Sequence, residues 1–210
     1  MSPTSGLLYV VCGPSGVGKT SLVRALVARR SGLALSVSYT TRPPRPGEQG
    51  GVAYHFVNME RFAAMQEAGD FLECAQVFDH HYGTSAVAVA QSLAAGQSVV
   101  LEIDWQGARQ AREKLTGCVT VMILPPSVAT LRARLGGRGD DSTSIDRRMR
   151  DALAELGHWP EFDYLVVNDS FEQALDDLCA ITRAGELRRD SQRSWLATNL
   201  PELPEAGENR

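Results

Sequence analysis

Gly13-Pro14-Ser15-Gly16-Val17-Gly18-Lys19-Thr20 decides the fold, because it matches the pattern Gly-x-x-x-x-Gly-Lys-Ser/Thr. An apolar run, Leu7 to Cys12, precedes it, and a helix-like segment, Leu22 to Arg29, follows it. In this context the glycines let backbone N–H groups point at phosphate oxygens, and the helix adds its positive end. Lys19 then reaches the outer phosphates, and the Thr20 hydroxyl can bind Mg²⁺. The stretch predicts a phosphate-binding loop; the alternative is a glycine turn that happens to carry a lysine.

Short apolar runs alternate with helical patterns along the rest of the chain. The expected strands are Leu7–Cys12, Leu33–Ser38, Ser98–Asp104, Val119–Leu124 and Tyr164–Asn168. The expected helices lie near residues 19–30, 105–115, 127–135, 144–157 and 170–189. Buried strands that alternate with helices are typical of a parallel sheet covered on both faces. We therefore predict an α/β fold, with a phosphate-loop core in which helices flank a parallel sheet.

Two regions interrupt this alternation. Residues 40–84 are rich in proline and glycine and contain the alternating segment Val52–Val57, which predicts a small, partly antiparallel insert that holds a substrate. Residues 136–144 are polar and glycine-rich, as expected of a mobile lid over phosphates or of a plain surface loop. We expect one domain, with a core at about 5–35, 97–135 and 150–190, an insert at about 36–90, a lid at about 136–149 and a tail at 199–210.

Composition narrows the class of protein. The 210 residues include 43% hydrophobic ones, enough for one sizeable core, and no segment approaches the length of a membrane span. The four cysteines lie far apart, and the adjacent His80 and His81 have no second ligand pair nearby, so we expect neither a zinc site nor a disulfide framework. A cytoplasmic protein is predicted. The net charge of −4 argues against a general nucleic-acid-binding surface.

Arginines gather in two places despite the negative net charge. Arg42 and Arg45 lie in the insert, and six more arginines lie between residues 132 and 150. Such arginines often form a solvated helix face. Two clusters beside a phosphate loop favour two phosphate-bearing ligands instead.

Seven segments carry a resemblance to a known family. They are GPSGVGKT, SYTTRPPRPGE, FLECAQV, HYGT, LEIDWQG, RLGGRG and VVND, and they cover most of residues 7–190. In these segments the chain resembles the guanylate kinases. The resemblance implies a phosphate-loop kinase core with a GMP-binding insert and a lid, and transfer of a phosphoryl group from ATP to GMP with Mg²⁺. It leaves the oligomeric state open.

The resemblance also implies which residues hold GMP. Those expected at the phosphate are Ser38, Arg42, Arg45, Tyr54 and Tyr82, and those expected at the guanine are Glu73, Thr84 and Asp104. A carboxylate at Glu73 can accept hydrogen bonds from the ring N–H and the exocyclic amine of guanine, a donor pair that adenine lacks. Without the resemblance, Glu73 could equally be an exposed edge-strand residue and the two tyrosines half-buried core residues.

At the ATP end the resemblance assigns Gly13 to Thr20, Arg134 and Asn168 to the nucleotide. The residues expected to act in catalysis are Lys19, Arg42, Arg138 and Arg148, and the residue expected at Mg²⁺ is Thr20. Arg147 and Arg148 are neighbours about 100° apart on a helix, so we expect only one of them, Arg148, to point at the phosphates. Glu102 has two open readings, a contact to magnesium-bound water and a structural contact to the loop.

Two other functions compete with this interpretation. A kinase of another phosphorylated metabolite, such as ribose 1,5-bisphosphate, would not need Glu73 and Thr84 at guanine-reading positions. A protein-interaction domain that resembles guanylate kinases but has lost catalysis would not need an intact loop with Lys19.

Overall fold

The structure, a computed structural model, describes residues 6–77, 79–136 and 142–203, apart from the side chains of residues 142–144 and 194. Five strands form the larger sheet in the order β2-β7-β1-β8-β9, and every pair in it is parallel. The strands are β1 (Leu8–Cys12), β2 (Leu33–Leu35), β7 (Ser98–Glu102), β8 (Val119–Leu124) and β9 (Tyr164–Val167). The predicted α/β fold with a parallel sheet is confirmed.

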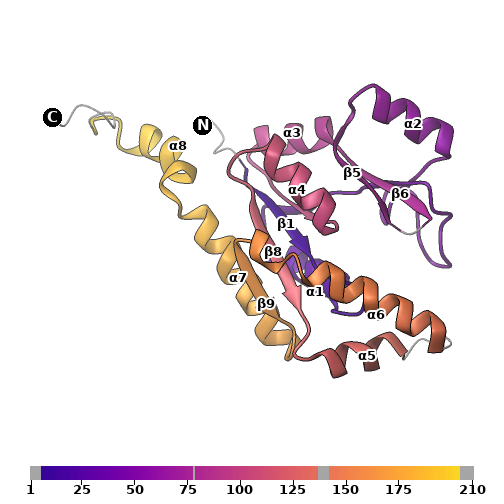
Figure 1. Cartoon of the computed structure of the whole chain (residues 1–210). Coiled ribbons are helices and arrows are strands. Elements are labelled where there is room, and N and C mark those ends of the chain that lie inside the picture. The colour runs from indigo at the N-terminus through magenta and orange to yellow at the C-terminus, as the bar shows by residue number, and fades with distance from the viewer. Residues whose placement is uncertain (1–5, 78, 137–141, 204–210) are drawn as a thin grey trace.

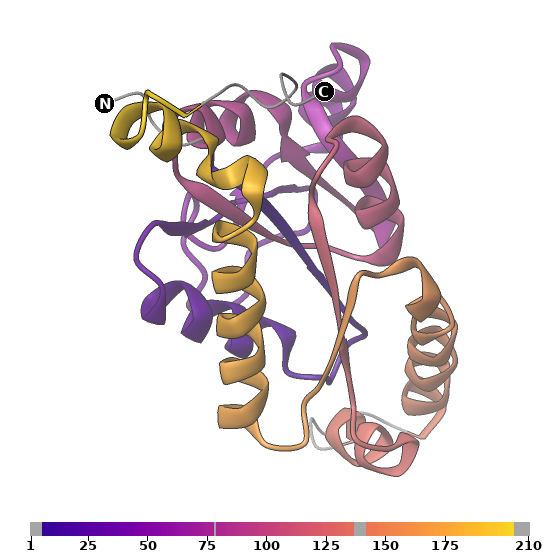
Figure 2. The same cartoon turned by 90° about the vertical axis from the view of Figure 1, so that its left-hand side faces the viewer.

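Helices cover both faces of the larger sheet because successive side chains of β1 point to opposite sides. Tyr9 and Val11 join the core that includes side chains of α1, α5, α6 and α7. Leu8, Val10 and Cys12 join the other core, with α3, α4 and one residue of β5. The helix bounds are α1 (Lys19–Arg29), α3 (Ala86–Ala94), α4 (Trp105–Lys114), α5 (Val128–Gly136), α6 (Ser142–Leu156) and α7 (Phe171–Glu186). Figure 2 shows α7 running alongside the sheet.

A smaller sheet, of order β4-β3-β6-β5, lies within the region expected to be an insert. Its strands are β3 (Tyr39–Thr40), β4 (His55–Phe56), β5 (Phe71–Val77) and β6 (His80–Ser85), and α2 (Met59–Glu67) packs on it. β6 pairs antiparallel with β3 and β5, whereas β3 and β4 are parallel. A separate core forms around Phe62, Met65 and Phe71. In Figure 1 the smaller sheet and α2 lie at the upper right, and α6 lies below them.

Several expectations from the sequence are wrong in detail. The alternating segment Val52–Val57 gives only the two-residue β4, because the N–H groups of Val52 and Ala53 turn back to the Gln49 carbonyl. The helix expected over 170–189 ends at Glu186, and a further helix, α8 (Arg189–Asn199), follows after a break. None of the helices in the described ranges is long and apolar enough to cross a membrane.

Helix α1 differs from several other helices in how its N-terminus is capped. Asp104, Ser85, Asn58 and Ser170 cap α4, α3, α2 and α7, and each accepts a hydrogen bond from a backbone N–H of the first turn. α1 begins after Gly18 with no side-chain cap and no acidic residue in its first turn. Its N-terminal N–H groups therefore stay available for an anion.

Candidate active site

The phosphate loop joins β1 to α1 at the carboxyl end of the central strand. Gly13 and Gly18 have φ angles of 143° and 91°, which L side chains rarely adopt. A Cβ on Gly13 would lie 2.7 Å from the carbonyl oxygen of Ile123, and one on Gly18 would lie 2.5 Å from Nδ2 of Asn168. Both positions thus require glycine, for conformation and for space.

Lys19 and Thr20 extend from the loop toward the end of β7. Lys19 Nζ donates to the carbonyl oxygens of Gly13 at 3.0 Å and Ile103 at 3.3 Å. The Thr20 hydroxyl donates to a carboxylate oxygen of Glu102. Of the two readings left open for Glu102, the structure shows the contact to the loop. Because carbonyl groups alone hold the ammonium in these hydrogen bonds, Lys19 can turn to phosphates when they arrive.

Arg42 is held firmly at the opposite end of the site. Its Nη1 donates to the carbonyl oxygen of Pro43 at 2.8 Å, and its Nη2 lies 2.8 and 2.9 Å from the two carboxylate oxygens of Glu48. The rings of Tyr54 and Phe56 have centroids 5.5 and 5.9 Å from the guanidinium carbon. Arg42 is 8% exposed, so its planar fork is oriented before a ligand binds.

The other residues predicted at the GMP phosphate surround this guanidinium. Ser38, Arg45, Tyr54 and Tyr82 line the same pocket. The two tyrosine rings meet edge to face with centroids 5.8 Å apart, and burial raises the pKa of Tyr54. The Arg45 N–H donates to Glu48 at 2.7 Å, so one carboxylate binds the segments of both arginines. Hydroxyl and guanidinium donors in this arrangement suit a compact dianion.

Glu73 lies deeper in the pocket and is 2% exposed. The Thr84 hydroxyl donates to its Oε1 at 2.5 Å. A Cβ on Gly107, in α4, would lie 2.5 Å from its Oε2, so only glycine leaves room for this carboxylate. Burial raises the pKa of Glu73 to about 7, while the hydrogen bond from Thr84 opposes the shift. A carboxylate in this state is stabilised by any ligand that brings N–H donors.

Asp104 also lines the pocket, but its carboxylate already serves the first turn of α4. Oδ1 accepts from the Gly107 N–H at 2.9 Å, and Oδ2 accepts from the Gln106 amide at 3.2 Å. Each oxygen keeps a further lone pair for a ligand. The role of Asp104 at guanine therefore stays a prediction.

Asn168 and Val17 do not line the pocket. The Asn168 side-chain amide donates to the Val17 carbonyl at 2.6 Å, and the backbone carbonyl of Asn168 accepts from Arg134 at 3.1 Å. Asn168 is 6% exposed and supports the phosphate loop from behind. Arg134 does line the pocket.

The arginines of α6 approach the loop from the lid side. Nη2 of Arg148 donates to the Ser15 hydroxyl at 3.1 Å. Arg147 lines the pocket as well, so both neighbours reach it despite the angle between them. Arg138 lies outside the described residues, as do most residues of the predicted glycine-rich lid.

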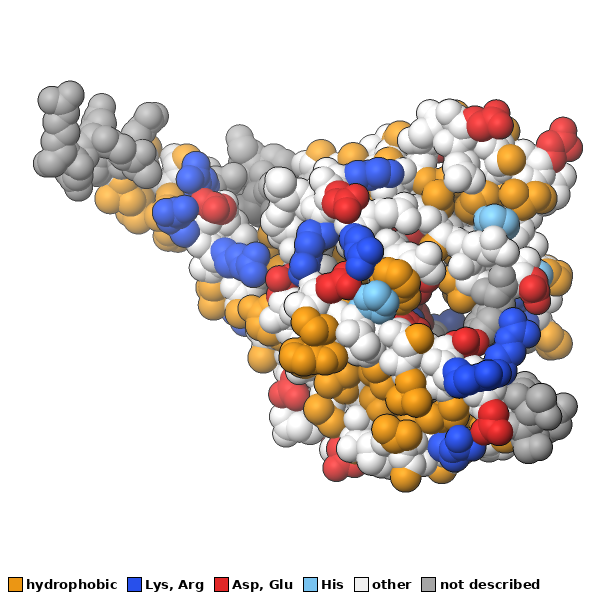
Figure 3. All heavy atoms as spheres, viewed as in Figure 1, with side chains coloured by type: hydrophobic (Ala, Val, Ile, Leu, Met, Phe, Trp, Pro, Cys, Tyr) orange, Lys and Arg blue, Asp and Glu red, His pale blue; other side chains and the backbone are white. Residues whose placement is uncertain are grey.

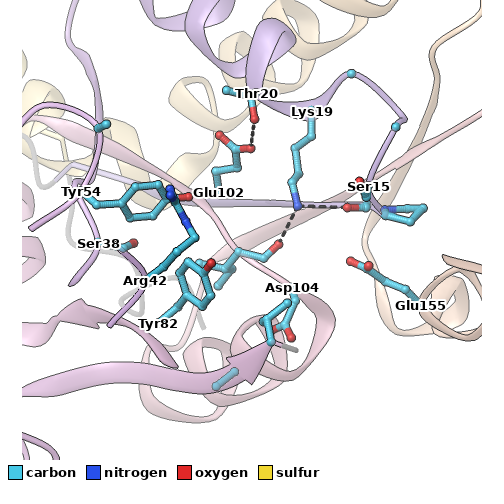
Figure 4. Close-up of a pocket in the computed structure, with 18 of the residues that line it drawn as sticks. Ser15, Lys19, Thr20, Ser38, Arg42, Tyr54, Tyr82, Glu102, Asp104 and Glu155 are labelled. Carbon is cyan, nitrogen blue, oxygen red and sulfur yellow. Dashed lines mark hydrogen bonds between the residues drawn. The ribbon is translucent and has the colours of Figure 1, made fainter. Parts of the chain in front are cut away.

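One continuous pocket of about 1500 Å³ contains both ends of this site. Ligand pockets usually measure about 300–1,000 Å³, so the space suits two ligands better than one. Figure 3 shows the surface hollowed between the smaller sheet and the part around α6. Figure 4 shows Lys19 and Thr20 from the loop, Tyr82 from β6, and Arg42 from the segment that follows β3, pointing into the same space.

The site also suits Mg²⁺ that arrives with a nucleotide. Within the described residues, no group of three His, Cys, Asp or Glu side chains is placed to hold a metal. Mg²⁺ in kinases needs only one or two protein ligands, because phosphates and waters supply the rest. The Thr20 hydroxyl, at the end of the loop and beside Glu102, fits that requirement.

Comparison with known proteins decides the family. A model of the guanylate kinase family matches residues 5–184. The chain belongs to the guanylate kinase family. It is 57% identical over 199 residues to the guanylate kinase of Alkalilimnicola ehrlichii, covering 94% of this chain and 98% of that one. It is 50% identical over 199 residues to the enzyme of Coxiella burnetii, covering 94% and 97%.

A solved guanylate kinase shares the fold. The crystal structure of the protein from Anaplasma phagocytophilum superimposes with a TM-score of 0.79 at 31% identity, covering 96% of this chain and 98% of that one. The match covers nearly the whole chain, so it includes the region of the smaller sheet.

Sequence reasoning missed three residues of this guanylate kinase site. Glu48 follows the two insert arginines closely, and its opposite charge was a usable signal. Gly107 lies in the motif LEIDWQG, but its role is to leave room for Glu73, which approaches α4 from the smaller sheet. Glu155 lines the pocket from α6, and nothing in its local sequence distinguishes it from an exposed helical glutamate.

Proposed function

We propose that the protein transfers the γ-phosphoryl group of ATP to GMP, giving ADP and GDP. The observation that carries the proposal is a single pocket with a phosphate loop at one end and a buried, donor-seeking carboxylate, Glu73, at the other. Ser38, Arg42, Arg45, Tyr54 and Tyr82 are proposed to bind the GMP phosphate, and Glu73, Thr84 and Asp104 the guanine. We also propose a cytoplasmic location, because all four cysteines are free thiols.

Catalysis in this site is a matter of alignment and charge, since phosphoryl transfer requires little covalent chemistry from the protein. The loop and the N-terminus of α1 hold the ATP phosphates. Arg42 holds the GMP phosphate so that its oxygen faces the γ-phosphorus, while Lys19 and Arg148 neutralise the charge that spreads over the transferred group. Mg²⁺, bound through Thr20 and the phosphates, would add further neutralisation.

A substrate comparison tests the proposal against its competitors. Release of ADP is measured with GMP, AMP, CMP and ribose 1,5-bisphosphate as acceptors. We expect turnover with GMP far above the other three. Preference for ribose 1,5-bisphosphate would indicate the other kinase class, and no turnover with any acceptor would indicate an interaction domain.

Replacing Arg42 by lysine should weaken the use of GMP although the charge is unchanged. A single ammonium cannot satisfy Pro43, Glu48 and a phosphate at once, as the guanidinium fork can. Loss of one charge-assisted hydrogen bond corresponds to about 10- to 150-fold in kcat/KM for GMP.

Arg45→Lys should lower kcat/KM less, because the Arg45 side chain is exposed. Steady-state kinetics measures both, with Arg29→Lys as the surface control. A wild-type kcat/KM for GMP in Arg42→Lys would contradict the assignment of Arg42 to the GMP phosphate.

Binding of GMP should release protons from Glu73. Burial raises its pKa to about 7 in the empty protein, so part of the molecules carry the proton at neutral pH. The N–H donors of guanine stabilise the ionised form, which lowers the pKa and expels that proton. A fraction of a proton should therefore leave per GMP bound near pH 7, and affinity should rise as pH increases through the neutral range.

Calorimetric titration in buffers of different ionisation enthalpy measures this release. Glu73→Gln provides the control, because it removes the contribution of Glu73 and leaves that of the GMP phosphate. The same proton count in both proteins would show that Glu73 does not ionise on binding.

A further inference from the structure

Glu155 brings a carboxylate into the nucleotide pocket from the penultimate residue of α6. Figure 4 shows its side chain directed at the phosphate loop, beside Ser15. Within the described part of the chain, Oε1 of Glu155 is buried and has no hydrogen-bond partner. A buried polar atom without a partner destabilises the fold, and such atoms in native proteins call for a structural or catalytic reason.

The carboxylate of Glu155 is linked to Lys19 through the first residue of the loop. Burial raises the pKa of Glu155, whereas the charge of Lys19 and the N–H of Gly13, which faces the carboxylate, both lower it. The carbonyl oxygen of the same Gly13 accepts a hydrogen bond from Lys19 Nζ at 3.0 Å. Gly13 therefore lies between the two charged groups, with its donor toward one and its acceptor toward the other.

The same helix contacts the loop a second time. Arg148 precedes Glu155 by seven residues, about two turns, so both side chains lie on one side of α6. Arg148 donates to the Ser15 hydroxyl at 3.1 Å. Met149 and Ala152, each 3% exposed, pack between them in the core that contains Val17 of the loop. α6 is thus docked along the phosphate loop, with Glu155 at its C-terminal end.

We propose that Glu155 is a positioning residue, whose carboxylate fixes Gly13 and, through the Gly13 carbonyl, the position of Lys19 relative to α6. The inference rests on the proposed function, because GMP-dependent turnover is its readout. It explains why a partly unpaired charge is retained where a side chain of the same size without charge would be more stable. A group held out of place by about 1 Å can cost on the order of 100-fold in rate.

Two substitutions separate positioning from simple structural support. Glu155→Gln keeps the shape and removes the charge, and Glu155→Met also removes the acceptor for the Gly13 N–H. We expect kcat to fall at least about tenfold in the first and further in the second, with KM for GMP within about twofold of wild type. The melting temperature should stay level or rise in both.

Asp146→Asn is the control. It removes an exposed carboxylate from the same helix and should leave kcat within about twofold of wild type. An unchanged kcat, or kcat and melting temperature falling together, would overturn the proposal.

A double substitution tests the link to Lys19. If Glu155 acts through Lys19, Glu155→Gln should lower kcat by no more than about twofold when added to Lys19→Ala, at enzyme concentrations high enough to follow the slow variant. Losses that multiply would overturn the link. Absence of GMP-dependent turnover in the wild type would remove the proposed function itself. Wild-type turnover with an unaffected Glu155→Gln would remove only this inference.

Discussion

Lys19→Ala should lower kcat by about 100- to 1,000-fold or more while the protein stays folded. In the empty protein the ammonium group donates to two backbone carbonyls, so its removal breaks these two hydrogen bonds and no ammonium–carboxylate hydrogen bond among the described residues. During the reaction it faces the charge that develops on the transferred phosphoryl group, where one preorganised donor contributes about 100- to 1,000-fold.

Steady-state release of ADP and a thermal melt measure the two halves of this prediction. Arg29→Ala is the matched control, because it removes a cation from the exposed side of the same helix. Turnover of Lys19→Ala within a few-fold of wild type would contradict the assignment of the loop to ATP.

Glu73→Gln should lower kcat/KM for GMP by on the order of 100-fold. The amide keeps the size of the side chain but loses its charge and turns one acceptor into a donor, which then opposes a donor of guanine. Sites built to pair a particular donor reject analogues that lack it, because their own buried groups stay unpaired. Burial of Glu73 at 2% exposure makes that penalty large.

Inosine monophosphate sharpens this test, because it lacks the exocyclic amine of guanine. The preference for GMP over IMP should shrink in Glu73→Gln, and AMP should be a poor substrate for both proteins. Glu67→Gln, an exposed carboxylate at the end of α2, is the control for a general effect of charge. An unchanged ratio of GMP to IMP would transfer base recognition to Thr84 and Asp104.

Strands that a local run of apolar residues identifies were predicted well. β8 has the predicted bounds, and β1, β7 and β9 differ by one or two residues at their ends. These are buried parallel strands, whose continuous apolar runs stand out between turn residues. The short strand β3 was not predicted, and β4 occupies only two residues of the alternating segment Val52–Val57. A strand of two residues is too short to show an alternation of apolar and polar side chains. β3 is held by its pairing with β6, and β4 is held by its pairing with β3 and by the turn at Gln49.

The same distinction applies to the site. The sequence alone determines the phosphate loop, since its glycines, Lys19 and Thr20 act through backbone conformation within one short segment. Only the tertiary structure decides that Gly107 leaves room for Glu73 and that Glu155 faces Gly13. Those pairs come from different turns, strands and helices. Which residues come into contact depends on how whole elements pack against one another, and a local sequence pattern does not specify that packing.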